Sequence, residues 1–261
     1  MIDLHCHILP GVDDGAVNLA DAVAMCRLAA ADGCTVMVAT PHQRHASFPL
    51  ATREALQTAH EELLAALVRD PSGEAGDPPA ERVEVRMGAE VRVDSELLAD
   101  MERPGGEALA LAGSRYVLLE FPRAEVGPAP EEIVHELLLG GWRPVLAHPE
   151  VLPWLEVPRL GALVEGGALL QVTAAAITSD FGRYPHQKVW ELLDEGLVHF
   201  VASDSHSPTW RAPGLSKARA LLTQRLGSAT ARALVEDNPA SVLADVPLQA
   251  TAAAAGHGGA G

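Results

Sequence analysis

A parallel α/β barrel is the fold that the sequence predicts. Apolar runs alternate with helical runs almost from the first residue to the last, which is the pattern of parallel β/α units. The helical runs have the roughly 10–15 residues of crossover helices. A chain of 261 residues also suits one barrel of this kind. About seven units would close into a distorted, TIM-like (β/α)7 barrel, and an open doubly wound sheet is the alternative.

The expected strands share an apolar interior that stops at a turn signal or a polar residue. They are expected at residues 2–6, 35–42, 83–93, 114–122, 143–150, 168–176 and 197–206. Helices are expected at residues 18–33, 51–70, 131–141, 158–167, 186–196, 216–226 and 229–236. In the first of them, Leu19, Val23, Cys26 and Ala30 recur on one face, and Gly33 is a C-terminal stop signal.

One domain is expected over residues 1–245, because neither an internal repeat nor a change of composition divides this part of the chain. Residues 71–81 are rich in proline and glycine and are expected to form a surface connection. Residues 246–261 are predicted to be a low-complexity, disordered tail.

Charge and composition narrow the classes of function. The 35 acidic and 19 basic residues give a net charge of −16, which repels nucleic acids and anionic membranes. The sequence contains no apolar run long enough to span a membrane and no secretory signal pattern at its start. The three cysteines are an odd number that suits a reducing compartment. We therefore expect a cytoplasmic protein that neither binds nucleic acid nor inserts into a membrane.

Metal-ligand residue types stand at or just after the ends of the expected strands. They are His5, His7, His42, Glu90, Glu120, His148, Asp204 and His206. In a parallel barrel the carboxyl ends of all strands meet on one face, so these residues converge in space. His5 and His7 are two residues apart on a strand, which directs both side chains to the same side. A mixed set of imidazoles and carboxylates without thiolates suits Zn, Mn or Fe, and so many ligands imply two or three ions.

The remaining histidines, the cysteines and the lysines narrow the possible chemistry of the site. His60, His135, His186 and His199 are expected to have structural roles, because they lie inside helices or before a strand end, whereas His45 is left open. A cysteine-dependent phosphatase is excluded, because Val12, Asp32 and Thr40 stand where its arginine would follow each cysteine by six residues. The lysines, Lys188 and Lys217, do not lie at strand ends. A bridge between ions must then come from a carboxylate, and Glu90 is the candidate.

Six motifs occur in order from residue 3 to residue 206: DLHCHILPGVDDG, ATPH, GAEVRV, LLEFP, PVLAHPE and ASDSH. Together they resemble the PHP (polymerase and histidinol phosphatase) superfamily. The nearest resemblance is to its CpsB/CapC branch, the metal-dependent bacterial protein-tyrosine phosphatases linked to capsule and exopolysaccharide synthesis. The resemblance implies a distorted β/α barrel that holds three divalent ions, with manganese favoured over Fe, Zn or Co.

The resemblance also implies roles for single residues. His5, His7, Glu90 and Asp204 would hold the first metal, Glu90 would bridge to a second completed by Glu120 and His148, and Asp14, His42 and His206 would hold a third. Asp13 would cap or orient the loop around Gly15. Arg211 matches a family arginine poised to bind phosphate. Arg44 is expected to add a second positive charge, and His45 to protonate the leaving group. Val151 stands where family members commonly have an arginine.

The expected activity is metal-assisted hydrolysis of phosphotyrosine, with a cognate bacterial tyrosine kinase as the expected partner. One alternative is a small phosphomonoester such as histidinol phosphate on the same machinery. A second alternative is a non-catalytic, metal-binding regulatory module, which the intact set of ligands disfavours. The sequence leaves the oligomeric state open.

Overall fold

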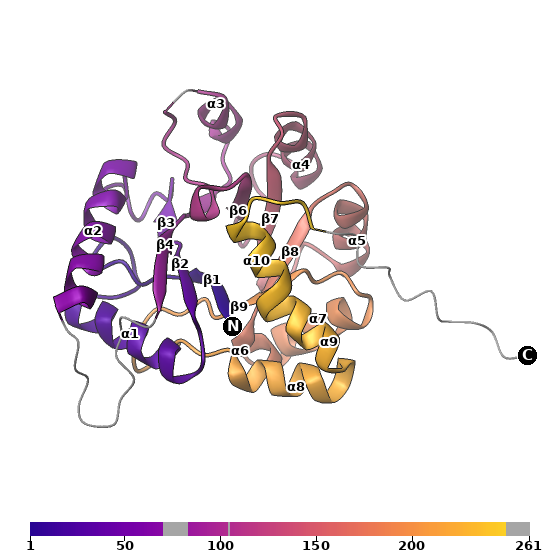
Figure 1. The fold of residues 1–261 in the computed structure, drawn as a ribbon. Helices are drawn as coiled ribbons and strands as arrows, with labels where there is room; N and C mark the ends of the chain where they lie inside the picture. Colours follow the sequence, from indigo (N-terminus) through magenta and orange to yellow (C-terminus); the bar gives the residue numbers. More distant parts are fainter. Residues whose placement is uncertain (70–82, 104, 249–261) are drawn as a thin grey trace, which may run out of the picture.

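The computed structural model describes residues 1–69, 83–103 and 105–248, and its strands pair in parallel throughout that part (Figure 1). The strands are β1 (Ile2–Cys6), β2 (Val36–Ala39), β3 (His42–Gln43), β4 (Glu84–Met87), β5 (Glu90–Arg92), β6 (Tyr116–Glu120), β7 (Arg143–Ala147), β8 (Leu169–Thr173) and β9 (Phe200–Ala202). Their order is β1-β2-β4 in one sheet and β3-β5-β6-β7-β8-β9 in the other. The predicted α/β class with a curled parallel sheet is confirmed.

Two of the expected strands are each broken in the middle. The strand expected at 35–42 is divided into β2 and β3 around Pro41, which has no N–H to give to a neighbouring strand. The strand expected at 83–93 is divided into β4 and β5 at Gly88. A Cβ at Gly88 would lie only 3.1 Å from the Leu111 Cα atom, so the close packing at this break favours glycine. Beyond both breaks His42 and Glu90 are paired in register, which places two candidate ligands side by side.

The two ends of the strand series lie against each other. The backbone N–H of His7 donates to the Ser205 carbonyl at 2.8 Å, and that of Asp204 donates to the His5 carbonyl at 2.8 Å. The buried Asp3 carboxylate accepts bonds from both the N–H and the hydroxyl of Ser203. The end of β9 is thereby joined to β1, although the seven-unit closed barrel itself stays a prediction.

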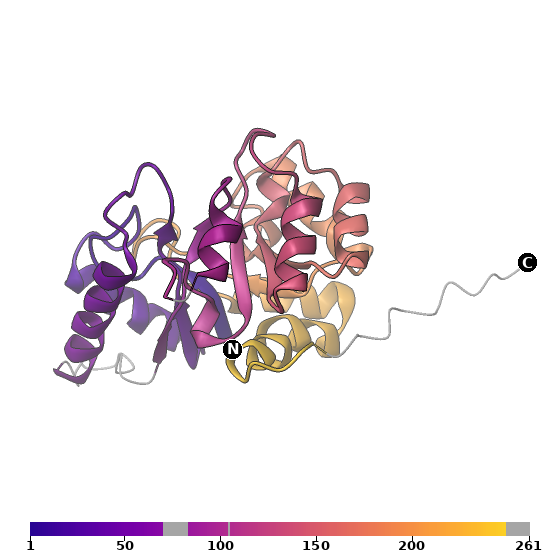
Figure 2. The ribbon, with the colours of Figure 1, turned by 90° about the horizontal axis from the view of Figure 1, so that it is seen from above.

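Helices cover the outside of the curled sheet (Figure 2). They are α1 (Leu19–Ala31), α2 (Arg53–Arg69), α3 (Leu97–Glu102), α4 (Pro130–Leu139), α5 (Val157–Glu165), α6 (Ala174–Ile177), α7 (Arg183–Asp194), α8 (Ser216–Leu226), α9 (Ser228–Arg232) and α10 (Asn238–Leu243). The sequence pattern did not predict α3, α6 or α10, each of which has six residues or fewer. His60 and His186 bond to backbone carbonyls, as expected for structural histidines.

The core has an inner and an outer part. The inner part contains Leu4, Val38, Tyr116 and Phe200 from four different strands, together with Val242 from α10. Because α10 packs against β1, it covers this inner core at the side where Figure 1 shows the N-terminus. The outer part fills the space between the strands and the surrounding helices. Apolar packing thus occupies one end of the strands and leaves the other end to polar side chains.

Residues just past 245, the predicted end of the domain, still contact the core. The Tyr116 hydroxyl donates to the Val246 carbonyl at 2.6 Å, and Leu248 packs against the inner core. The connection predicted at 71–81 and the remainder of the predicted tail, 249–261, lie outside the described residues. Within the described ranges, no helix is both long and apolar enough to cross a membrane.

Replacing His199 by asparagine is expected to make folding less sensitive to acid. The Leu170 N–H donates to His199 Nδ1 at 3.1 Å, and burial lowers the pKa of His199 to about 4. In the unfolded chain His199 takes up a proton near pH 6.5. The stability that the neutral ring gives to the folded protein is therefore present above pH 6.5 and is lost as the pH falls toward 4. The loss is about 3 kcal/mol in the free energy of unfolding.

Asparagine retains an acceptor for the Leu170 N–H but does not titrate. Denaturant unfolding of metal-free wild-type and His199→Asn proteins, between pH 7 and pH 4, measures the effect. A pH dependence that is the same in both proteins would contradict the prediction.

Candidate metal centre

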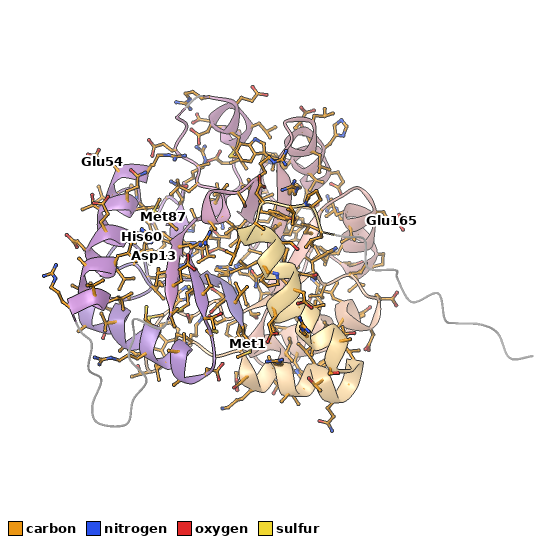
Figure 3. All side chains as sticks on the ribbon, in the orientation of Figure 1. Met1, Asp13, Glu54, His60, Met87 and Glu165 are labelled. Carbon is orange, nitrogen blue, oxygen red and sulfur yellow. The ribbon has the colours of Figure 1, made fainter. Side chains whose placement is uncertain are left out.

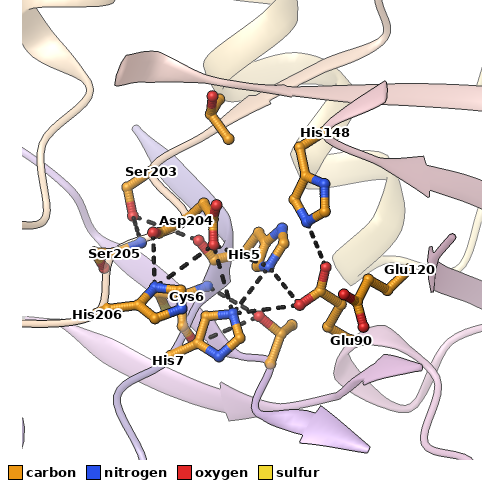
Figure 4. Close-up of polar contacts among 12 residues, drawn as sticks. His5, Cys6, His7, Glu90, Glu120, His148, Ser203, Asp204, Ser205 and His206 are labelled. Carbon is orange, nitrogen blue, oxygen red and sulfur yellow. Dashed lines mark hydrogen bonds and ion pairs between the residues drawn. The ribbon is translucent and has the colours of Figure 1, made fainter. Parts of the chain in front are cut away.

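The nine residues predicted as metal ligands lie together near the carboxyl ends of the strands. Figure 4 labels all of them except Asp14 and His42. Their ligand atoms form four overlapping groups in which all atoms lie within 4.8 Å of one another. The groups are His7–Asp14–His42–His206, His5–Glu90–His148, His5–His7–Asp204 and His42–Glu90–Glu120. Residues that are up to two hundred positions apart in the sequence therefore form one cluster, as the strand-end pattern predicted.

His5 and His7 are oriented by partners on their outer nitrogens. His5 Nδ1 lies 2.7 Å from Gln171 Oε1, and His7 Nδ1 lies 2.7 Å from Asp13 Oδ2. The two Nε2 atoms then face each other at 3.2 Å. Asp204 Oδ1 and Glu90 Oε2 each lie 3.5 Å from both Nε2 atoms. Four ligand atoms converge on one point, with both imidazoles held as metal-binding histidines usually are.

Glu90 lies at the centre of the cluster. Its Oε2 is 3.0 Å from His42 Nδ1, and its Oε1 is 2.6 Å from His148 Nε2. Burial disfavours the charged carboxylate, yet the surrounding histidines, His5 and His148 above all, hold the pKa of Glu90 well below its usual range. Burial also disfavours charge on His148, but the Glu90 carboxylate raises the pKa of that imidazole to about 9. The Glu90 carboxylate and the His148 imidazole thus each favour the charged form of the other.

The donor set fits divalent cations. His42 Nδ1, Glu90 Oε2, Glu120 Oε2 and His148 Nδ1 are buried atoms without a hydrogen-bond partner. Unsatisfied buried polar atoms are rare and need an explanation, and metal coordination supplies one for the atoms that face into the cluster. Imidazole and carboxylate ligands without thiolate suit Mn, Fe or Zn.

Glu120 is placed differently from the grouping implied by the resemblance. Its Oε1 accepts a bond from Arg92 Nη1 at 2.7 Å, and its Oε2 lies 3.6 Å from His42 Nδ1. Glu120 therefore groups with His42 and Glu90, whereas His148 groups with His5 and Glu90. Asp14, His42 and His206 come together as expected, with His7 added to them.

Arg211 reaches the cluster, and Arg44 does not. Arg211 Nη2 donates to the Asp204 carbonyl at 3.0 Å and to Asp204 Oδ2 at 2.5 Å, and its guanidinium lies 5.3 Å from the centre of the Phe181 ring. Arg44 donates instead to both carboxylate oxygens of Asp94, at 2.7 and 2.9 Å. Arg44 is not among the residues that line the cavity above the candidate ligands, and its expected contribution of charge to the site stays a prediction.

His45 lies beside the cluster and does not line the pocket. Its ring centre is 5.2 Å from that of His42 and 5.3 Å from that of Phe48, and burial lowers its pKa. The Ser47 N–H donates to His45 Nδ1. The structure thus places His45 behind a ligand histidine, and its expected role as a proton donor stays a prediction.

A cavity of about 540 Å³ opens above the candidate ligands. Residues that the sequence did not single out complete its wall: Phe121, Arg123, Leu152, Phe181, Tyr184 and Pro185. Val151 also lines it, so the position where the family commonly has an arginine presents an apolar side chain to the cavity. Because these residues come from loops and from α7, no pattern at the strand ends could have indicated them.

The loop that carries Val151 is held from below by Lys188. This buried lysine donates to the carbonyls of Pro149, Leu152 and Leu155 at 2.7–2.8 Å. Each ammonium proton thus has an acceptor in one loop, which compensates for burying the charge. Lys188 thus supports the loop that forms part of the cavity wall.

Asp13 connects two ligands to the loop that carries a third. Its Oδ2 contacts His7 Nδ1 and accepts a bond from the His42 N–H, while its Oδ1 accepts one from the Gly15 N–H at 2.9 Å. Figure 3 shows Asp13 among the strands, far inside the outer helices that carry Glu54 and Glu165. The predicted role of Asp13 in orienting the loop around Gly15 is confirmed, and its bond to His7 was not foreseen.

Replacing Asp13 by asparagine is expected to weaken metal binding by about 10–100-fold, because the amide no longer fixes and polarises the His7 ring. Titration of metal-free protein with Mn²⁺ measures the change. Asp21→Asn is the matched control, since Asp21 lies half-buried at the start of α1 and belongs to none of the candidate ligand groups. Equal Mn²⁺ affinity in the two variants would contradict the prediction.

A curled parallel sheet with clustered His, Asp and Glu at its carboxyl edge defines a class of metal-dependent α/β enzymes. Residues 1–244 match the family model for capsular polysaccharide synthesis, CpsB/CapC. The chain belongs to the CpsB/CapC family, in agreement with the resemblance seen in its motifs.

Relatives in this family are named for one activity. The tyrosine-protein phosphatase YwqE of Bacillus subtilis is 34% identical over 242 residues, which cover 91% of this chain and 89% of YwqE. The tyrosine-protein phosphatase CpsB of Streptococcus pneumoniae is 28% identical over 252 residues, covering 94% of this chain and 99% of CpsB.

Comparison with solved structures supports the same family. A crystal structure from work on YwqE and CpsB, described as unique metal-dependent tyrosine phosphatases, aligns with a TM-score of 0.82 at 32% identity and covers 95% of this chain and 96% of its own. An organophosphorus hydrolase from Deinococcus radiodurans aligns with a TM-score of 0.52 at 14% identity, covering 93% of this chain and 91% of its own, and shares the fold alone.

Proposed function

We propose that this protein is a metal-dependent protein-tyrosine phosphatase. The observation that carries the proposal is the cluster of nine imidazole and carboxylate ligands at the base of an open cavity with aromatic walls. Membership of the CpsB/CapC family and the names of its relatives support the same activity. The proposed substrate is phosphotyrosine on a bacterial tyrosine kinase of capsule or exopolysaccharide synthesis, met in the cytoplasm. The seven strand units are proposed to act as one distorted barrel that presents the cluster.

The proposed cofactors are three divalent ions, with manganese favoured. His5, His7, Glu90 and Asp204 would hold one of them, Glu90 would bridge to a second, and Asp14, His42 and His206 would hold the third, with Glu120 and His148 completing the second site. Bound ions would lower the pKa of water toward neutrality and offset the charge of the phosphoryl oxygens.

Side chains that line the cavity would bind and position the phosphotyrosine substrate. Arg211, which lies over the Phe181 ring at the cavity wall, would bind phosphoryl oxygens through guanidinium N–H groups not used on Asp204. Phe181 and Tyr184 would pack against the phenyl ring of the substrate. The leaving tyrosinate has a pKa near 10, so it leaves with modest help. Direct attack by water is the proposed step, so no covalent phosphoenzyme is needed.

Metal-stripped protein assayed on a phosphotyrosine peptide, before and after Mn²⁺ is restored, tests the proposal. Turnover is expected only with Mn²⁺, and a His5→Ala/His7→Ala variant is expected to lose it. Histidinol phosphate is the comparison substrate. Metal binding with no turnover of the peptide would overturn the tyrosine phosphatase assignment, and turnover of histidinol phosphate in its place would establish the alternative.

A further inference from the structure

We infer that Arg123 makes the cavity selective for phosphotyrosine that has an acidic residue beside it in the peptide. The inference rests on the proposed function and names a feature of its substrate. Arg123 follows the carboxyl end of β6 and lines the same cavity as the candidate metal ligands. It is exposed to solvent, unlike all the candidate ligands except Asp14.

The two arginines of the cavity wall differ in what they already bind. Arg211 is committed to Asp204, through the carbonyl and the carboxylate, and its guanidinium lies over the rings of Phe181 and Trp210. Arg123 forms no hydrogen bond or ion pair with any described residue, while most other arginines in the described ranges have a carboxylate or carbonyl partner. Its guanidinium is therefore a charge at the cavity rim that remains available to a substrate.

The nearby acidic residues are held by another arginine. Arg159 donates to Glu125 Oε1 at 2.7 Å and to both carboxylate oxygens of Glu131, at 2.6 and 2.9 Å. Glu125 is only two residues after Arg123, so it is the natural local partner for that guanidinium. Its engagement with Arg159 leaves Arg123 without an internal counterion.

The backbone that carries Arg123 is fixed on both sides. Before it, Trp154 Nε1 donates to the Pro122 carbonyl at 3.0 Å, and the Trp154 ring meets the buried Phe121 ring edge-on. After it, Arg159 holds Glu125 and lies 5.6 Å from the centre of the Trp154 ring. A fixed backbone reduces the entropy lost when Arg123 binds a partner.

The carboxylates in the cavity make the positive charge of Arg123 important for binding an acidic peptide. The cavity contains the carboxylates of Asp14, Glu90, Glu120 and Asp204, and the whole chain carries a net charge of −16. A peptide with a further carboxylate is repelled unless a local cation compensates. The neighbouring wall at Val151 and Leu152 is apolar and cannot compensate. Arg123 can, because a guanidinium binds a carboxylate through two parallel hydrogen bonds.

The test compares phosphotyrosine peptides that are identical except for glutamate or glutamine at single positions on either side of the phosphotyrosine. For the best position, the wild type with Mn²⁺ is expected to prefer the glutamate peptide about three- to fivefold in kcat/KM, through KM. The ratio is expected to fall to about one in Arg123→Gln and to be partly kept in Arg123→Lys. Arg86→Gln, an exposed arginine on β4 with the same change of charge, is expected to keep the wild-type ratio.

A ratio that is unchanged in Arg123→Gln overturns the inference, including the case in which both peptides lose turnover equally. A wild type without preference at any position overturns it as well. Fluorescence anisotropy of the same labelled peptides gives the ratio from binding alone. If the wild type does not hydrolyse any peptide, the proposed function fails, while the binding ratios of wild type and Arg123→Gln still decide the inference.

Discussion

Replacement of Glu90 by glutamine is expected to reduce Mn²⁺-dependent phosphatase activity by about 1,000-fold or more, a barrier increase of about 4 kcal/mol. Glu90 is fully buried and belongs to two of the four ligand groups, where its two oxygens face different histidines. Glutamine has nearly the same shape, so the fold is expected to remain. The amide oxygen, however, is a poor substitute for a charged ligand shared by two ions.

Three measurements separate a loss of ligation from a loss of folding. Metal content by mass spectrometry is expected to fall, while the circular dichroism spectrum is unchanged. In the metal-free protein, NMR titration is expected to show the pKa of His148 well below about 9, because the carboxylate that raises it has been removed. Glu84→Gln, at the opposite end of the same broken strand, is the control. Full metal content and activity in Glu90→Gln would refute a central role for this residue.

The clustering of the candidate ligands could be predicted because their positions depend on simple geometry. A parallel strand has one carboxyl end, so the residue type at that end indicates the site without any knowledge of the packing. The two-residue spacing of His5 and His7 likewise determines that both rings share a side. The contacts within the cluster could not be predicted, since Glu120 lies beside His42 and His148 beside His5, and such contacts depend on side-chain torsions.

The break at Pro41 is a stop signal that the sequence itself contains. The break at Gly88 could not be predicted in the same way, because the apolar pattern runs through it and the close packing of Gly88 against Leu111 is seen only in the folded chain. The side chains that orient the histidine rings could not be predicted from the sequence either. Gln171 lies in the middle of an apolar strand, and nothing in its spacing connects it with His5, which it contacts across 166 residues.

Arg44 and Arg211 show most clearly what the sequence alone cannot predict. Arg44 and Arg211 both follow strand ends, and both have left-handed backbone conformations, with φ of 62° and 51°. Their difference lies in tertiary partners, because Asp94 holds one outside the cavity lining and Asp204 holds the other beside the site. Sequence position brings an arginine near a site, but only the folded structure determines which carboxylate it meets.

Replacement of Arg211 by alanine is expected to lower kcat/KM for a phosphotyrosine peptide by about 100–1,000-fold, because the charge that develops on the phosphoryl group loses a fixed donor. Arg211→Lys is expected to be intermediate, since an ammonium keeps the charge but lacks the two-pronged geometry. Arg44→Ala is the contrasting variant. Its partners Asp94 and Asp100 lie outside the cavity lining, so it is expected to lower the melting temperature rather than kcat/KM.

Metal content must be measured beside the kinetics, because Arg211 also contacts the candidate ligand Asp204. If Arg211→Ala retains its ions and loses turnover, the guanidinium acts on the substrate. If it loses ions in proportion to activity, Arg211 is a positioning residue for Asp204. An equal loss of kcat/KM in Arg44→Ala and Arg211→Ala, with both proteins folded and fully loaded with metal, would contradict the assignment of the phosphate-binding arginine made from their ion pairs.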